Sequence, residues 1–330
     1  MKSVLITGAS GFVGGFLVDE ALSRGFKVYA AIRKSSNTQY LQDSRIHFLY
    51  PNFSNVEELT QLVDEYQFDY FIHNAGVTKS KTEQGYFDVN AGFLKNIVQA
   101  LQLARHKVSK LIFVSSLAAF GPAEYTESGV VSNDSIPHPV TNYGRSKLKA
   151  ESYLTSQSNV PYIIIRPTAV YGPREWDLFT VYKMINQGLN ITIGMKDQLL
   201  TFIYVKDLVR VIMDATESEI SNKAYFVSDY NVYTSSEYNA QIAKALSKKK
   251  TLKFRLPISI VKVVAIISEN IAKISGKYPP LNLEKVNELK AKSWKIDTSP
   301  LQTDLNFIPE YDLEKGLEES IDWYKQKGHL

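Results

Sequence analysis

A tyrosine and a lysine stand four residues apart near the middle of the chain. In a helix, Tyr143 and Lys147 would lie on one face, so the phenol and the ammonium could reach the same small volume. A free tyrosine has a pKa of about 10 and is a poor acid or base at neutral pH, but a nearby cation lowers this pKa by stabilising the phenolate. The pair therefore predicts proton transfer by Tyr143, with Lys147 lowering its pKa. Because this spacing is common by chance, the interpretation depends on where the pair lies in the fold.

Two serines follow a segment that is typical of a buried strand. The run Lys110–Ser115 predicts the strand, and Ser116 stands just beyond it. In parallel sheets, ligands bind at the carboxyl ends of the strands. Ser116 could there donate a hydrogen bond to a substrate oxygen, whereas Ser115 suits a local turn. We therefore expect Ser116 to complete a catalytic site with Tyr143 and Lys147.

Three glycines with the spacing GxxGxxG lie between the first expected strand and the first expected helix. At such a turn, the backbone amides and the helix N-terminus can hold a pyrophosphate without obstruction by side chains. The strand–turn–helix context predicts a dinucleotide site and makes the motif far more specific than a bare glycine triplet. The residues expected to contact the dinucleotide here are Gly8, Ser10, Gly11, Phe12, Val13 and Gly14.

The second expected strand ends at two cations, Arg33 and Lys34. A site that prefers NAD normally carries an acid about 20 residues past the glycines, where it binds the ribose 2′-hydroxyl. Cations at this place suit a 2′-phosphate instead, and Arg33 could also stack on adenine. We therefore predict NADP(H) as the cofactor. NAD(H) is the alternative if Asp43 or another acid reaches the ribose.

Short apolar runs alternate with helical patterns through the first half of the chain. This alternation predicts an α/β fold with a doubly wound (Rossmann) parallel sheet. The expected strands are Ser3–Thr7, Lys27–Ile32, His47–Tyr50, Tyr70–His73, Lys110–Ser115 and Tyr162–Arg166. The expected helices between them are Gly14–Arg24, Val56–Tyr66, Gly92–Ala104 and Tyr143–Ser156.

After Arg166 the pattern loosens and the later part becomes rich in helices and lysines. We predict a dinucleotide-binding domain over residues 1–170, to which residues 200–230 return. Residues 171–199 and 231–330 would form a smaller, mostly helical substrate lobe. Expected elements in this half are a helix over Leu178–Gln187, a run Leu200–Val205 leading into a helix over Asp207–Thr216, a strand over Ala224–Val227 and a helix over Leu313–Lys325.

Composition excludes several classes of protein. A net charge of +4 over 330 residues gives no basic stripe for nucleic acid, and the absence of cysteine removes disulfides and thiolate sites. Five scattered histidines provide no helical ligand pair, so no metal site is expected. The apolar stretch Ile258–Ile274 is interrupted by Lys262 and other polar residues, so no transmembrane segment is expected. With no signal peptide apparent, we expect a cytoplasmic protein.

Several motifs together resemble the extended branch of the short-chain dehydrogenase/reductase family. They are TGASGFVG at the glycine turn, HNAG at His73–Gly76, DVN at Asp88–Asn90, FVSSLAAFG at Phe113–Gly121, YGRSK at Tyr143–Lys147, RPTAVYGP at Arg166–Pro173 and YVKD at Tyr204–Asp207. The resemblance implies a serine/tyrosine/lysine mechanism, a homodimer, and a lysine that also holds the nicotinamide ribose. It adds further cofactor-binding residues, which are Asn52, Asn74, Ala75, Gly76 and Pro167. It makes Asn90 a structural or proton-relay residue.

Two positions in the second half of the chain bear on the substrate. Family members that act on nucleotide sugars usually carry polar anchors where this chain has Leu200-Thr201 and Thr168-Ala169, although Arg174 could still hold a diphosphate. The pattern looks most like dihydroflavonol reductases and 3β-hydroxysteroid dehydrogenases, which implies reduction of a ketone on a hydrophobic small molecule such as 3-ketosphinganine. The alternatives are a nucleotide-sugar epimerase or dehydratase with tightly bound NAD, and a non-catalytic dinucleotide sensor.

Two apolar segments bear on the expectation of a hydrophobic substrate. The helix stripe Phe179, Val181, Tyr182, Met184 and Ile185 and the segment Ile258–Ile267 would favour a hydrophobic pocket. Such stripes more often form core or a dimer face. The lysines that flank the second segment would also suit peripheral contact with an anionic membrane surface.

Overall fold

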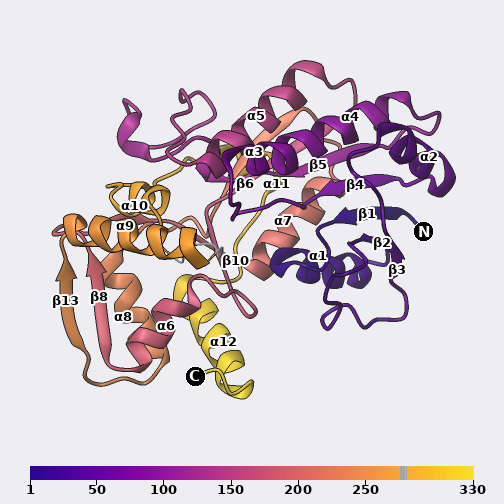
Figure 1. Ribbon diagram of the computed structural model, residues 1–330. Coiled ribbons are helices and arrows are strands. Elements are labelled where there is room, and N and C mark those ends of the chain that lie inside the picture. Colours follow the sequence, from indigo (N-terminus) through magenta and orange to yellow (C-terminus); the bar gives the residue numbers. More distant parts are fainter. Residues whose placement is uncertain (276–278, 280) are drawn as a thin grey trace.

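The computed structural model describes residues 1–275, 279 and 281–330. Its centre is a seven-stranded sheet in the order β11-β6-β5-β4-β1-β2-β3, and all of its strand pairs are parallel (Figure 1). The strands are β1 (Ser3–Thr7), β2 (Lys27–Ala31), β3 (His47–Leu49), β4 (Tyr70–His73), β5 (Lys110–Val114), β6 (Tyr162–Pro167) and β11 (Lys223–Val227). The predicted doubly wound parallel sheet is confirmed.

Helices cover both faces of this sheet. Figure 1 shows α1 (Phe12–Ser23) and α7 (Val205–Glu217) below it, and α2 (Val56–Tyr66), α4 (Phe93–Leu103) and α5 (Asn142–Gln157) above it. Alternate residues of β1 point to opposite faces of the sheet. Val4 and Ile6 pack in the core between the sheet and helices α1 and α7, whereas Leu5 packs in the core on the other face. Burial on both faces explains why each central strand reads as a continuous apolar run.

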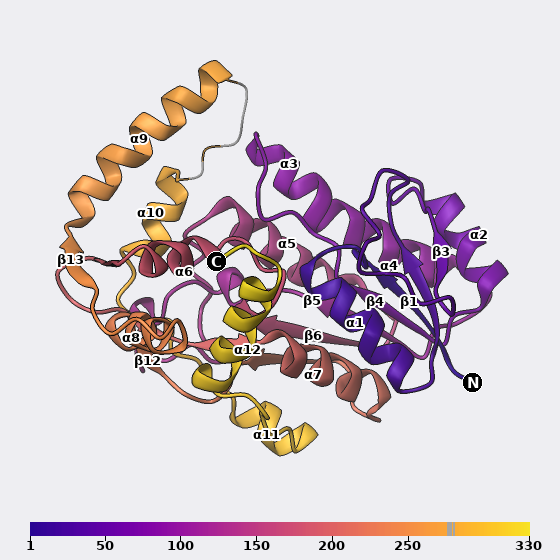
Figure 2. The same ribbon diagram turned by 90° about the horizontal axis from the view of Figure 1, so that it is seen from below.

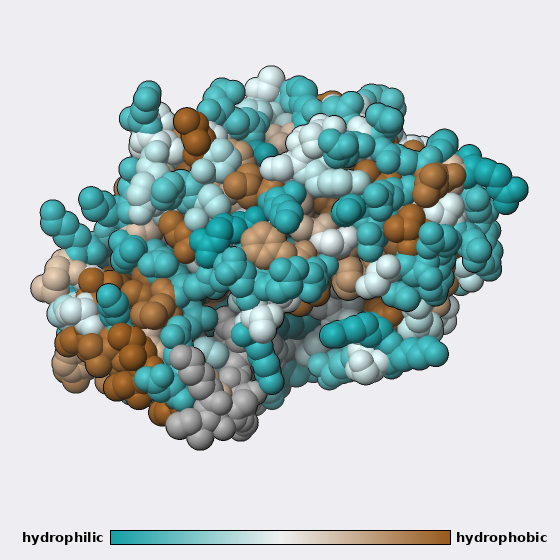
Figure 3. Space-filling model, turned by 45° about the horizontal axis from the view of Figure 1, so that its top comes forward, coloured by the Kyte–Doolittle hydropathy of each residue, from teal (hydrophilic) through white to brown (hydrophobic). Residues whose placement is uncertain are grey.

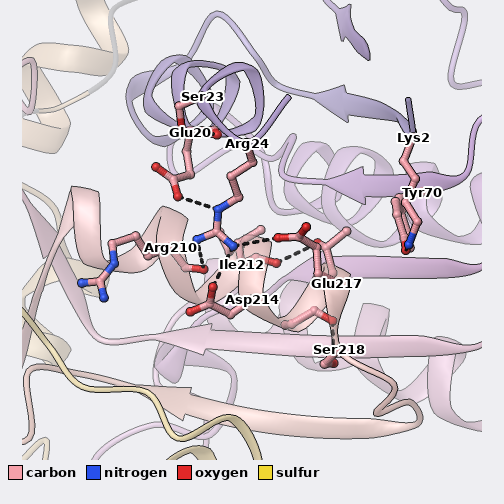
Figure 4. A network of polar contacts seen from close by, with 12 residues as sticks. Lys2, Glu20, Ser23, Arg24, Tyr70, Arg210, Ile212, Asp214, Glu217 and Ser218 are labelled. Carbon is pink, nitrogen blue, oxygen red and sulfur yellow. Dashed lines mark hydrogen bonds and ion pairs between the residues drawn. The ribbon is translucent and has the colours of Figure 1, made fainter. Parts of the chain in front are cut away.

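A polar network joins the two helices below the sheet (Figure 4). Arg24 follows α1, and its guanidinium binds Glu20 at 2.7 Å, Asp214 of α7 at 2.7 Å and Glu217 at 2.9 Å. Three carboxylates around one planar guanidinium fix the end of α1 against α7. This contact helps to hold α1 in place from its far end, opposite the glycine turn.

The strand order reverses at β1, which lies between β2 and β4. Ligands bind doubly wound sheets at such a switch point, beyond the carboxyl ends of the strands. The turn after β1, the loop after β4 and the segment after β5 all leave the sheet at this edge. They carry the glycine turn, the residues Asn74–Gly76 and Ser116, respectively.

A second set of elements packs around a separate core of aromatic residues. Its strands are β7 (Ala169–Tyr171), β8 (Leu189–Ile193), β9 (Leu199–Leu200), β10 (Phe202–Tyr204), β12 (Tyr233–Thr234) and β13 (Leu252–Leu256), which pair as β10-β7, β12-β9 and β13-β8. Helices α6 (Phe179–Asn186), α8 (Ser235–Ala245) and α12 (Leu313–Gln326) pack around this core. Helices α9 (Ile258–Ser275) and α10 (Leu283–Leu289) form a smaller cluster of their own, and α11 (Ser299–Leu305) packs against the core between the sheet, α1 and α7. The division into two domains at the predicted boundaries stays a prediction.

The stripe on α6 forms core, which was the more frequent of the roles expected for it, and does not line a substrate pocket. Tyr182 and Ile185 are buried in the aromatic core, and Phe179 and Val181 pack against it. Tyr324 of α12 stacks on Phe179 with the ring centroids 4.5 Å apart. The stripe therefore joins α6 to α12, because an apolar helix face that meets another element is core and not a pocket wall.

The other helix boundaries lie close to those expected. The helix predicted to begin at Gly92 is preceded by a π-helical turn, Asp88–Gly92, and by α3 (Glu83–Phe87). The β8-β13 pair lay outside the predictions, although β13 alternates apolar and cationic residues as a strand does, and it is exposed along most of its length. Across the described part of the chain, no helix is long and apolar enough to cross a membrane.

Candidate active site

The glycine turn after β1 is closed by contacts that exclude larger residues. Gly8 has a φ of +67°, and a Cβ there would lie 2.8 Å from the Cα of Ala75. A Cβ on Gly14 would lie 2.0 Å from the carbonyl oxygen of Gly8. The exposed Gly11 precedes α1, and no side chain caps that helix. The turn is therefore a backbone cradle at a helix N-terminus, and this suits the pyrophosphate of a dinucleotide.

A buried hydrogen-bond chain attaches the loop after β4 to the glycine turn. The hydroxyl of Thr7 lies 2.9 Å from Nδ1 of His73, and the backbone N–H of Ala75 donates to the same hydroxyl at 3.0 Å. Burial, together with the charge of Lys147, lowers the pKa of His73 to about 3. The imidazole is therefore neutral at ordinary pH and acts as a fixed support for the loop.

Asn90 holds the other end of the same loop. Its Oδ1 accepts from the backbone N–H of Val77 at 2.8 Å, and its Nδ2 donates to the carbonyl of Val77 at 3.0 Å. The same Nδ2 donates to the hydroxyl of Ser146 in α5 at 2.9 Å. With the side chain fully buried and its donors and acceptor engaged in this way, the geometry favours the structural role for Asn90.

The predicted tyrosine and lysine lie in α5, which the hydroxyl of Thr141 caps by accepting from Gly144 at 3.1 Å. A Cβ on Gly144 would lie 2.2 Å from the carbonyl oxygen of Ala118, so this glycine lets α5 approach the segment after β5. The Nζ of the buried Lys147 donates to the carbonyl of Val114 at 2.8 Å. Burial lowers the pKa of Lys147 to about 8, although Glu151 opposes that change.

Tyr143 differs from the expectation of a lowered pKa. Burial raises the pKa of its phenol to about 12, while a hydrogen bond with Ser116 acts in the opposite direction and the charge of Glu288 adds to the increase. The ammonium of Lys147 is engaged with the end of β5, so desolvation of the phenolate outweighs any help from the lysine. Tyr143 is therefore a protonated phenol at neutral pH, in contact with the hydroxyl predicted to accompany it.

The two neighbouring serines have different surroundings. Ser115 is buried and donates to Glu151, which also accepts from Arg166 at 2.7 Å. Ser116 is partly exposed, and its hydroxyl accepts from the N–H of Ala118 at 3.1 Å. Ser115 thus belongs to a buried charge network behind the site, and Ser116 is the hydroxyl that meets Tyr143.

Beyond β2, Arg33 and Lys34 are exposed at the edge that carries the glycine turn. Asp43, the alternative partner for a ribose, accepts from Arg45 through both carboxylate oxygens, at 3.0 and 2.7 Å. Asn52 is exposed after β3, and its Oδ1 accepts from Ser54 at 3.1 Å within a turn. The acid is therefore occupied by a cation of its own loop, and two cations remain at the position expected for a 2′-phosphate.

The positions that would anchor a nucleotide sugar are used inside the protein. The hydroxyl of Thr168 donates to the carbonyl of Val227 at 3.2 Å, and that of Thr201 donates to the carbonyl of Trp294 at 2.9 Å. Both threonines are buried, as is the adjacent Pro167 at the end of β6. None of these side chains offers a charge to a diphosphate.

Two features near the site had little or no local signal in the sequence. The guanidinium of Arg174 lies 4.4 Å from the ring centroid of Phe16 and 4.0 Å from that of Tyr40, and its buried Nε and Nη1 find no partner among the described residues. The place of Arg174 directly after VYGP is its one signal in the sequence. Glu288, from α10, has no such signal, because α10 reaches Tyr143 only through the tertiary fold.

Comparison with known proteins agrees with this geometry. The model of the NAD dependent epimerase/dehydratase family matches residues 4–232. The N-acetyl-alpha-D-glucosaminyl-diphospho-ditrans,octacis-undecaprenol 4-epimerase of Escherichia coli O157:H7 is 25% identical over 97% of this chain and 95% of its own length. The ceramide reductase of Caulobacter vibrioides is 23% identical over 99% of this chain and 96% of its own length.

Among solved structures, the UDP-glucuronic acid 4-epimerase from Bacillus cereus in complex with NAD superposes with a TM-score of 0.77. It is 23% identical to this chain, and the match covers 98% of this chain and 99% of that one. At this identity the similarity shows the fold.

Proposed function

Because the chain belongs to the NAD dependent epimerase/dehydratase family and is an enzyme of the extended short-chain dehydrogenase type, we propose that it reduces a ketone on a hydrophobic substrate with NADP(H), or oxidises the matching alcohol. The family confirms the resemblance that the motifs suggested. The observation that carries the proposal is the convergence of Ser116, Tyr143 and Lys147 beside a glycine cradle at one edge of the sheet. Function is argued from this site, because the fold alone hosts many reactions.

In the proposed mechanism, the phenol of Tyr143 donates its proton to the substrate oxygen as that oxygen gains charge. The hydroxyl of Ser116, which contacts Tyr143, turns its single hydrogen to the same oxygen and donates to it. Lys147 supplies positive charge beneath Gly76, where a Cβ would lie 3.3 Å from its Nζ. When bound, the dinucleotide supplies the hydride.

The dinucleotide would be held by the glycine turn, by Asn74–Gly76 after β4, and by Arg33 and Lys34 beyond β2. The fit rests on the turn itself, where backbone atoms leave no room for a Cβ at Gly8 or Gly14. NADP(H) is the proposed form because cations occupy the position that would otherwise carry an acid.

Replacing Arg33 by serine is expected to weaken NADPH binding about 10- to 100-fold, because a charge-assisted hydrogen bond is worth about 1.5–3 kcal/mol. NADH affinity should change little, since NADH has no 2′-phosphate. Fluorescence titration with both nucleotides measures the two constants, and Asn37→Ser, in the same exposed loop, is the matched control. If the unaltered protein binds NADH far more tightly than NADPH, the assignment of Arg33 is wrong.

NADPH affinity is also expected to fall as the pH rises above about 8, the pKa to which burial lowers Lys147. A lysine with a lowered pKa is charged below that value and neutral above it, and the charged form is the one that attracts the dinucleotide. Tyr143 does not interfere, because its pKa of about 12 keeps it protonated through this range.

Titration of NADPH binding between neutral pH and pH about 10 tests this expectation, with each further pH unit above the pKa costing up to about tenfold. In Lys147→Arg the charge persists, since an arginine does not titrate in this range, and the profile should become flat. An equal fall in the arginine variant would remove Lys147 as the cause.

A hydrophobic substrate is supported by two observations. The positions that anchor nucleotide sugars hold Thr168 and Leu200-Thr201, and both threonine hydroxyls are bonded within the protein. The names of the two relatives, an epimerase of an undecaprenol-linked sugar and a ceramide reductase, both include a lipid. The direct test is NADPH loss with long-chain ketones such as 3-ketosphinganine, compared with UDP- and dTDP-sugars.

The second candidate is an epimerase or dehydratase, and Arg174 favours it. Its buried Nε and Nη1, which have no hydrogen-bond partner in the described part of the chain, could donate to a diphosphate, although Phe16 and Tyr40 also hold the guanidinium as a structural contact. Such an enzyme would be purified with tightly bound NAD and would convert its sugar substrate without net loss of NADPH. Net NADPH loss with a ketone would decide for the reductase.

A further inference from the structure

Helix α9 exposes an apolar face to solvent. Its side chains on that face are 42–61% exposed, and they are Ile260, Val263, Val264, Ile266, Ile267 and Ile271. Most of them follow the three- and four-residue spacing that forms a continuous stripe on a helix. Figure 3 shows the result as a brown region at the lower left of the molecule, where α9 lies. Contiguous apolar surface of this kind marks an interaction site.

The opposite face of α9 is packed inside the protein. Val261 and Ala265 are buried and cluster with Val286 of α10, and Leu256 and Ile258 pack against this cluster. The exposed stripe is therefore additional to the residues that hold the helix in place. Among the described residues, none of the six side chains of the stripe belongs to that buried cluster.

The chain that leads into α9, together with the start of the helix, is rich in cations. Residues 238–268 contain no aspartate or glutamate, and their seven cations are Lys244, Lys248, Lys249, Lys250, Lys253, Arg255 and Lys262. Only two of these seven are in ion pairs among the described residues, Lys244 with Glu314 at 2.6 Å and Arg255 with Asp197 at 3.1 Å. Five of the seven line a hollow of about 540 Å³ next to β13, the strand that leads into α9.

We propose that α9 and these cations form a docking surface for an anionic lipid bilayer. The apolar stripe would enter the interface between headgroups and acyl chains, and the lysines would contact the acidic headgroups. Charge selects this occupant over a second copy of the chain. Two such faces brought together would oppose like charges around the apolar stripe, whereas an anionic membrane matches both features.

Helix α10 links this surface to the candidate active site. Helix α10 packs beside α9, and its Glu284 accepts from the backbone N–H of Asn142 at 2.6 Å, at the start of α5 (Figure 2). Helices α9 and α10 would thus lie between a bilayer bound at the stripe and the start of α5. Membrane docking itself does not depend on the proposed reaction, so either can fail while the other holds.

The test is flotation of the full chain with vesicles of phosphatidylcholine alone and of phosphatidylcholine and phosphatidylglycerol in equal parts. The protein is expected to float with the anionic vesicles and to be released by high salt, which screens the lysines. The double variant Val263→Ser/Ile267→Ser should bind at least about tenfold more weakly, because two apolar side chains no longer enter the bilayer. Lys249→Glu/Lys253→Glu should lose the preference for anionic vesicles.

The matched control is Leu103→Ser/Ile136→Ser, which removes two aliphatic side chains that are 69% and 87% exposed elsewhere on the protein. It should float like the unaltered chain. The proposal is overturned if the unaltered protein binds neither vesicle, or if the control variant loses as much binding as the α9 variant. It is also overturned if the protein forms a dimer that Val263→Ser/Ile267→Ser dissociates while vesicle binding is absent.

Discussion

Tyr143→Phe is expected to lower the rate of ketone reduction about 10²- to 10⁴-fold, the usual contribution of a positioned acid. The substitution removes only the hydroxyl that would donate a proton to the substrate and that contacts Ser116. The ring remains to fill its place in α5, so the fold and the cradle at Gly8–Gly14 should be unaffected. Steady-state NADPH oxidation gives the rate, and fluorescence titration should give an unchanged affinity for NADPH.

Tyr153→Phe is the matched control, because Tyr153 lies in the same helix and is only partly buried against the core under α5. It should retain nearly full activity. Turnover that survives in Tyr143→Phe would exclude this tyrosine as the proton donor. If NADPH binding were lost instead, the residue would be a structural part of the cofactor site.

Gly14→Ala is expected to weaken the affinity for the dinucleotide about a hundredfold or more, which is equivalent to about 3 kcal/mol. The added Cβ would lie 2.0 Å from the carbonyl oxygen of Gly8 and 2.8 Å from the Cα of Ala9. Both are backbone atoms, so the turn must open to admit the methyl group. An opened turn no longer directs its amides at one phosphate.

Gly92→Ala controls for replacing a helical glycine, because there a Cβ would lie at an ordinary 3.7 Å from the carbonyl oxygen of Phe87. Circular dichroism and thermal unfolding show whether Gly14→Ala still folds. Gly11→Ala provides a milder variant, since its Cβ would meet only the Gly8 oxygen, at 3.2 Å. Normal dinucleotide affinity in a folded Gly14→Ala protein would place the cofactor elsewhere.

Features that depend on nearby residues could be predicted from the sequence. β1 and β4 have the predicted bounds, because strands buried on both faces are unbroken apolar runs between polar turns. The helix expected over Tyr143–Ser156 begins one residue earlier, where the capping Thr141 fixes its start. The proximity of Ser116 to Tyr143 followed from the rule that parallel strands present their carboxyl ends at one edge.

Features that depend on distant packing could not be predicted. The raised pKa of Tyr143 reflects desolvation and the carboxylate of Glu288, which the fold brings from α10. The lysine was expected to act on the phenol, but its Nζ reaches the carbonyl of Val114 instead. The apolar stripe of α6 is core and that of α9 is exposed, yet the two patterns look alike along the chain. Only the neighbours of each helix distinguish them.

The two buried bases under the cofactor loop have a joint consequence. The pKa of His73 is lowered to about 3 and that of Lys147 to about 8, each mainly by burial. Between these two pH values one base is neutral and the other is charged, so together they carry a single, constant positive charge. The electric potential that this pair creates at Gly76 is therefore the same in mildly acidic and in neutral surroundings, and it disappears only in alkali. The fold thus keeps the reacting end of the site insensitive to pH over the range where an ordinary histidine would change its charge.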